Sequence, residues 1–107
     1  ATLIQESSAT ASPGLNITGG SGSWYMIDID NSANGAVTYV KLYDDAAPTV
    51  GTTEPAWVLR APASTRVVYA VSTAVAFTAL SFAAVTTPGR SGTTSPSSAV
   101  PVRLMAT

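Results

Sequence analysis

The sequence contains no cysteine and no histidine. Without cysteine the chain cannot form disulfides, thiolate nucleophiles or sulfur-ligated metal sites. Without histidine it lacks the side chain most often used in general acid–base catalysis. It also shows no glycine-rich phosphate loop, nucleophile elbow or zinc-ligand spacing. We therefore expect no catalytic residues, no metal and no cofactor, and we expect the chain not to be an enzyme.

Charge is scarce as well. Charged residues make up 10% of the chain and hydrophobic residues 46%, whereas about 25% of a typical soluble domain is charged. Because surface charge normally keeps a lone monomer in solution, such a chain is expected to cover part of itself with other protein. Its five cations are scattered rather than clustered, so no nucleic-acid partner is expected. These cations are Lys41, Arg60, Arg66, Arg90 and Arg103.

A chain of 107 residues is long enough for one compact core. The segment 67–89 carries no charge and approaches the length of a bilayer crossing. Ser, Thr and Pro interrupt it, and its apolar residues are mostly small or β-branched, so we expect two buried strands and no membrane span. No basic region followed by an apolar run opens the sequence, and no signal peptide is expected.

Alternating apolar and polar residues, separated by Gly, Pro and Asn clusters, predict strands and almost no helix. The expected strands are 23–30, 36–43, 57–59, 66–71, 75–85 and 99–105. The Asn31–Gly35 turn is expected to join the first two as a hairpin. Six or seven short strands with turns between them predict an all-β fold, a small β-sandwich or barrel occupying residues 24–107.

The first 23 residues are rich in Ser, Thr, Ala and Gly, and the run Gly19–Ser23 is typical of a flexible joint. One interpretation is a loosely ordered terminus. The other is an extended arm in which Leu3–Ile4 or Leu15–Ile17 adds a short strand to the sheet edge of a neighbouring subunit. The sequence within this segment, Asn16–Thr18, also matches a glycosylation acceptor, which is a weak signal by itself.

Few side chains suggest binding chemistry. Asp28 and Asp30 lie two residues apart, so they share one face of a strand, and with the neighbouring asparagines they could hold calcium; turn capping is the commoner use of such a pattern. Asp44 and Asp45 could pair with an arginine of another subunit. Trp24 is expected to share the exposed face of its strand with Asp28 and Asp30, and therefore to be available for a contact.

Three phrases between residues 39 and 87 resemble a known group of proteins. They are YVKLY at 39–43, APTVGT at 47–52 before Pro55, and VAFTALSFAAVTT at 75–87, followed by a polar loop and the terminal strand AVPVRL. The chain is similar in these phrases, over residues 24–105, to small virion structural proteins of tailed phages, including cyanophages. It lacks their glycine-rich phrase before Phe77, and its last loop contains more proline.

This resemblance implies a capsid decoration (cement) protein that binds the outside of the head shell. The expected partners are the major capsid protein and further copies of the chain, as a dimer or trimer, and the expected location is the virion surface. The alternative is a receptor- or carbohydrate-binding module of a tail or head fibre. The residues expected at protein interfaces are Leu3, Ile4, Leu15, Ile17, Trp24, Asp44 and Asp45.

Overall fold

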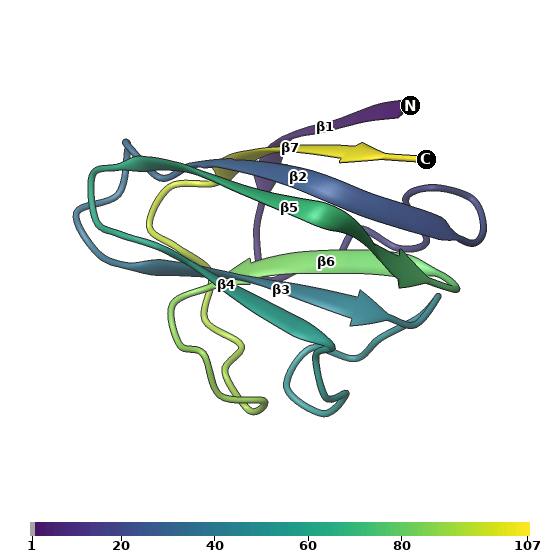
Figure 1. The fold of residues 1–107 in the computed structure, drawn as a ribbon. Helices are drawn as coiled ribbons and strands as arrows, with labels where there is room; N and C mark the ends of the chain where they lie inside the picture. The colour runs from purple at the N-terminus through teal and green to yellow at the C-terminus, as the bar shows by residue number, and fades with distance from the viewer. Residues whose placement is uncertain (1) are drawn as a thin grey trace.

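Two antiparallel sheets pack face to face in the computed structural model, which describes residues 2–107 (Figure 1). Every regular element in these residues is a strand, so the predicted all-β fold is confirmed and takes the sandwich form. The strands are β1 (Thr2–Ala9), β2 (Gly22–Asp30), β3 (Thr38–Asp44), β4 (Trp57–Ala61), β5 (Arg66–Phe77), β6 (Leu80–Val85) and β7 (Val100–Ala106).

The larger sheet has the order β1-β7-β2-β5, and the smaller has the order β4-β3-β6. Only β3 and β4 are consecutive strands that also pair with each other. From β4 onward each connection carries the chain to the opposite sheet, so the two layers are tied together at several points (Figure 1). Apolar side chains from both inner faces form the core, with Ile27, Val40, Leu42 and Leu104 almost completely buried.

The expected hairpin across the Asn31–Gly35 turn is wrong. β2 pairs with β5 and β7, whereas β3 pairs with β4 and β6 in the other sheet. The chain crosses between the sheets because Asn31 is fully buried and its Nδ2 donates to the carbonyls of Ala36, Ala61 and Pro62 at 3.0, 3.2 and 3.0 Å. An Asn-rich turn is compatible with a hairpin and with a crossing between sheets. Here the buried Asn31 amide is found with the crossing.

The position of Trp24 also differs from the expectation. The register of β2 shifts between Trp24 and Met26 against both of its neighbours. Tyr25 is an extra residue relative to β7, whereas residues 71–74 of β5 are extra relative to β2. A bulge of this kind reverses the alternation of side chains beyond it. As a result Trp24 lies in the core with Ile27, 3% exposed, and its ring meets that of Trp57 edge-to-face at 6.0 Å.

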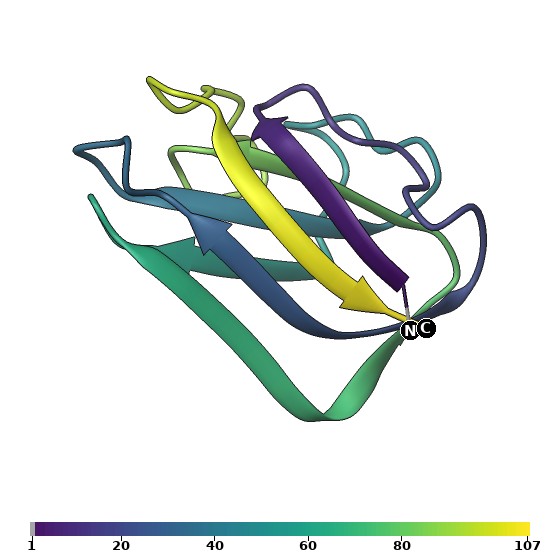
Figure 2. The ribbon, with the colours of Figure 1, turned by 90° about the horizontal axis from the view of Figure 1, so that it is seen from above.

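The uncharged segment that begins at Val67 forms β5 and β6. β6 is buried along its whole length, as expected, but β5 is a half-exposed edge strand that runs unbroken from Arg66 to Phe77. It bends sharply where residues 71–74 have no partner in β2 (Figure 2). Within residues 2–107 there is no helix with the length and apolar character that a membrane crossing requires.

The segment expected to be an arm lies against the sandwich of its own chain. β1 pairs antiparallel with β7, and Ala1 is outside the described residues. After β1 the backbone follows the edge of β6, where Gly14 exchanges two hydrogen bonds with Phe82 and Ile17 donates to Leu80. Residues 10–17 therefore cover an edge of the smaller sheet that would otherwise be open.

Candidate interaction surfaces

The outer face of the larger sheet is open to solvent (Figure 2). Its most exposed apolar residues are Leu3 on β1, 46% exposed, and Val68 on β5, 54% exposed. Half-buried methionines, Met26 on β2 and Met105 on β7, lie side by side between them. Apolar side chains thus extend across the sheet on a face that the chain itself does not cover.

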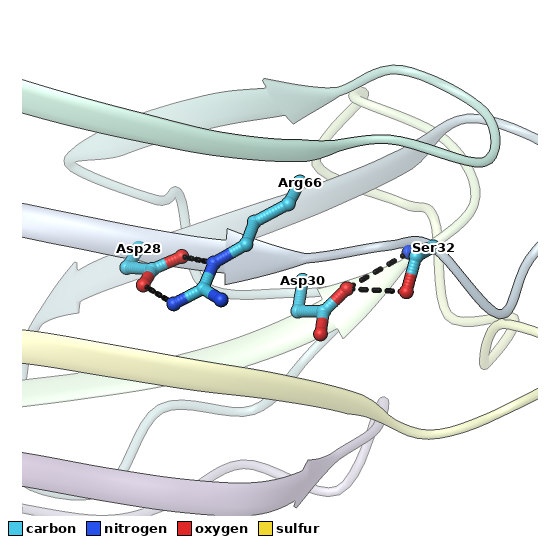
Figure 3. A network of polar contacts seen from close by, with 4 residues as sticks. All are labelled: Asp28, Asp30, Ser32 and Arg66. Carbon is cyan, nitrogen blue, oxygen red and sulfur yellow. Dashed lines mark hydrogen bonds and ion pairs between the residues drawn. The ribbon is translucent and has the colours of Figure 1, made fainter.

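Four charges share this face with the apolar residues. Arg66 donates to both carboxylate oxygens of Asp28, and its Nε lies 2.9 Å from Asp28 Oδ1 (Figure 3). This hydrogen bonding and the charge of Asp28 raise the pKa of Arg66. Beside the pair, Asp30 accepts hydrogen bonds from the hydroxyl and the backbone N–H of Ser32 at 2.6 and 3.1 Å, which lower the pKa of Asp30. The fourth charge, Arg103, is exposed on β7.

The oxygen-rich group considered for calcium does not converge on one point. The guanidinium of Arg66 occupies the oxygens of Asp28. Asn31 Oδ1 accepts from Asn34 Nδ2 and Thr38 Oγ1, and Asn34 Oδ1 accepts from the backbone N–H of Ser98. These oxygens therefore hold the turn together, which is the structural use of such a pattern.

The outer face of the smaller sheet, in contrast, is partly covered by the chain's own loops, over β3 but not over the exposed Val58 and Arg60 of β4. Lys41 and Tyr43 lie on this face and are 0% exposed. The Lys41 ammonium donates to the backbone carbonyls of Gly89 and Gly92 at 2.5 and 3.1 Å, so it fixes the loop 86–99 over the sheet. Burial lowers the pKa of Lys41 from its usual value of 10.5, an effect that the charge of Glu54 opposes.

The two glycines held by Lys41 provide a matched pair of substitutions. A Cβ at Gly92 would lie 2.0 Å from Thr87 Oγ1 and 3.0 Å from the Thr87 carbonyl oxygen, whereas a Cβ at Gly89 would meet nothing within 4 Å. We expect Gly92→Ala to lower the free energy of unfolding by about 1–3 kcal/mol and Gly89→Ala to change it by less than about 1 kcal/mol. Urea unfolding measures both. Equal effects would contradict this packing of the loop.

The structure brings together two of the predicted interface groups. The Ser81 hydroxyl donates to the Asp45 carbonyl at 2.6 Å and accepts the Asn16 N–H at 2.9 Å, so the loop around Leu15 lies beside the loop that follows β3. Leu15 is 52% exposed. Asp44 Oδ1 accepts the backbone N–H groups of two residues in the β5–β6 turn, at 2.7 and 3.0 Å. We call Leu15, Asp44 and Asp45 the acidic corner.

The other predicted interface residues are distributed differently. Leu3 is exposed on the outer face of the larger sheet, whereas the acidic corner lies in loops linked to β6 of the smaller sheet. Ile4 and Ile17 are partly buried and pack against the core. Trp24 is a core residue. The seven residues therefore do not form a single surface.

The burial of several polar residues was not predicted from the sequence. Lys41, Asn31 and Asn34 are among the least exposed side chains, although lysine and asparagine are usually found at the surface. A signal for Lys41 was present: it stands between apolar residues in the middle of a strand, within YVKLY. Its partners are backbone carbonyls of a loop about 50 residues later, which no local pattern indicates.

No protein-family model matches the sequence, and neither the curated proteins nor the solved structures contain a significant match.

Proposed function

We propose that this chain is a decoration protein of tailed-phage heads, which binds the outside of the capsid shell and stabilises it by bridging capsomers. The proposal starts from the resemblance of three sequence phrases, at 39–43, 47–52 and 75–87, to small virion proteins of tailed phages. Two of those phrases form paired strands, since YVKLY is the centre of β3 and the last phrase includes all of β6, its neighbour. The resemblance therefore concerns two of the three strands of the smaller sheet.

The observation that carries the proposal is the presence of open contact surfaces on a rigid scaffold. Leu15 is an exposed apolar side chain in a loop that Ser81 links to the backbone of the exposed Asp45, and the backbone on either side of Leu15 is hydrogen-bonded to β6. Exposed apolar groups of this kind, bordered by polar residues, are typical of protein contact sites. We assign the acidic corner to the major capsid protein, whose complementary site would be apolar and basic.

The alternative, a carbohydrate-binding module, requires aromatic rings exposed in a groove. Trp24 and Tyr43 are buried. The four remaining Trp and Tyr residues, Tyr25, Tyr39, Trp57 and Tyr69, are half-buried. This arrangement supports the decoration role over sugar stacking.

The proposal is tested by mixing the purified chain with expanded, undecorated shells of the phage whose genome encodes it. We expect the chain to sediment with the shells at saturable stoichiometry, and to raise the temperature at which the shells rupture. A chain that stays in the supernatant at all concentrations, with the rupture temperature unchanged, would contradict the proposal.

The acidic corner is tested by Leu15→Glu and Asp45→Lys. Both residues are exposed, so folding stability should change by less than about 0.5 kcal/mol, while affinity for the shells should fall about tenfold or more. Val58→Glu is the matched control, because Val58 is an apolar side chain on β4 that is 39% exposed. If the control weakens binding as much as Leu15→Glu, the assignment of this corner is wrong.

A further inference from the structure

The outer face of the larger sheet has a regular arrangement that the proposed function does not use. The register of its strands places outward side chains in rows that cross the sheet from β1 to β5. The first row is Leu3, Met105, Met26 and Ala70. The second row is Gln5, Arg103, Asp28 and Val68. The first row is entirely apolar, and the second has its opposite charges on the two central strands.

The four charges on this face sum to zero, and the residues of opposite charge lie on different strands. The acidic residues Asp28 and Asp30 are on β2, and Arg103 is on the adjacent strand β7. Arg66 neutralises Asp28 from the other side. Within residues 2–107, Arg103 forms no ion pair with an acidic side chain, although it lies directly across from Asp28 in the register. It borders a shallow hollow whose lining includes Asp28, Asp30, Arg66 and Pro101.

A twofold axis that runs along the strands, midway between β7 and β2, makes this face complementary to itself. A second copy stacked through this axis lays its β2 over β7 of the first copy, and its β7 over β2. Met105 then faces Met26 of the partner subunit. Arg103 faces Asp28 of the partner subunit, with Asp30 of the partner subunit one step further along the strand. The symmetry repeats each contact, as in any isologous interface.

We propose that two copies of this chain associate through the outer faces of their β1-β7-β2-β5 sheets. Sheets stacked face to face stand about 10 Å apart, a gap that methionine and arginine side chains fill from both sides. The occupant is a second copy because pairing the face with itself places Arg103 of each copy opposite the acidic residues on β2 of the other. The smaller sheet offers less area for such a contact, since the loop held by Lys41 covers part of its outer face.

The size of the face sets the strength of the contact. Four strands at about 4.8 Å spacing and about seven residues in length give a sheet of roughly 450 Å² per copy. A standard interface uses about 800 Å² per partner. The dimer is therefore expected to be weak and to dissociate on dilution. This inference does not rest on the proposed function. A chain that dimerises in this way but does not bind phage shells would support the dimer and contradict the decoration role.

A charge exchange tests the contact. Arg103→Asp places a carboxylate opposite Asp28 of the partner subunit and near Asp30, and Asp30→Arg places a guanidinium diagonally across from Arg103 of the partner subunit. Each variant alone should raise the dissociation constant about tenfold or more, because like charges meet twice across the axis. An equimolar mixture should associate more tightly than either variant. The carboxylate introduced at position 103 then lies diagonally across from the guanidinium introduced at position 30, and the unchanged Arg103 of the other subunit still faces Asp28. Sedimentation velocity across a concentration series measures all three.

The control is Arg60→Asp, which makes the same charge change on β4 of the other sheet, where the side chain is exposed. It should leave the dissociation constant unchanged, and circular dichroism should show that every variant is folded. Met105→Glu provides a second test, because it places charge in the apolar row and should abolish the dimer. A wild-type chain that stays monomeric at millimolar concentration overturns the inference. The inference is also overturned if none of the outer-face variants raises the dissociation constant of the dimer. It is overturned as well if the mixture of the two charge variants has a dissociation constant no lower than that of either variant alone.

Discussion

Replacing Asn31 with leucine is expected to lower the free energy of unfolding by at least about 3 kcal/mol. The Asn31 amide donates to three backbone carbonyls and accepts from Asn34 and Thr38, all in a fully buried position. Leucine branches at Cγ as asparagine does but supplies none of these partners, and each buried polar group left unpaired costs about 1–3 kcal/mol. Urea unfolding followed by tryptophan fluorescence measures the loss.

Two further variants separate hydrogen bonding from packing at this position. Asn31→Asp keeps the shape of the side chain but removes both N–H donors, so we expect a loss at least as large as that of Asn31→Leu. Ser32→Ala alters the exposed neighbour, which bonds only to Asp30, and should cost less than about 1 kcal/mol. If Asn31→Asp were as stable as the wild type, the amide could not be what holds the crossing between the sheets.

Trp24→Ala is expected to destabilise the chain by about 3–5 kcal/mol, the range typical of a large aromatic removed from a core. Its ring is 3% exposed and packs edge-to-face on Trp57, so alanine leaves a cavity between the two sheets. Trp24→Phe should cost much less, because the indole N–H has no hydrogen-bond partner within residues 2–107 to lose. Thermal unfolding compares the two variants.

Leu15→Ala is the control, since Leu15 is exposed and its truncation should change stability by less than about 0.5 kcal/mol. The pair also separates the two roles expected for these residues from the sequence. A Trp24→Ala variant with wild-type stability and weakened association would show that Trp24 is a contact residue, in contradiction to its buried position.

The fold class could be predicted because strand patterns and turn residues are local. β3 and β7 were located almost to the residue, as the apolar alternation of Thr38–Asp44 and Val100–Ala106 is regular. Pairing could not be predicted, because it depends on contacts between distant residues. Neither the bulge at Tyr25 nor the inward direction of Asn31 can be recognised in the local sequence, which is equally consistent with an uninterrupted hairpin.

The candidate surfaces were predictable only in part. Exposure of Leu3, Leu15, Asp44 and Asp45 agrees with their expected availability for contacts. That Leu15 would lie beside Asp45 was not predictable, because the Ser81 hydroxyl that links the two loops comes from a strand far along the chain. The position of Arg103 on β7 beside the acidic residues of β2 was also not predictable, because it depends on these two strands being neighbours.

The outer face of the smaller sheet is partly covered by the chain's own loops, whereas the outer face of the larger sheet is open (Figure 2). The loop held by Lys41 covers the outer face of β3, while the four-stranded sheet presents apolar side chains and balanced charges to solvent. A chain with so few ionisable groups has little surface charge to keep such a face apart from other protein. This asymmetry is the physical reason to regard the chain as a component of an assembly.

Cryo-electron microscopy of tailed-phage particles from the source of this sequence is the most direct test of the proposed role. We expect density for a seven-stranded sandwich on the outside of the head, repeated at equivalent positions across the shell, with the acidic corner against the major capsid protein. Particles whose heads lack that density, or that carry the chain only on the tail, would contradict it.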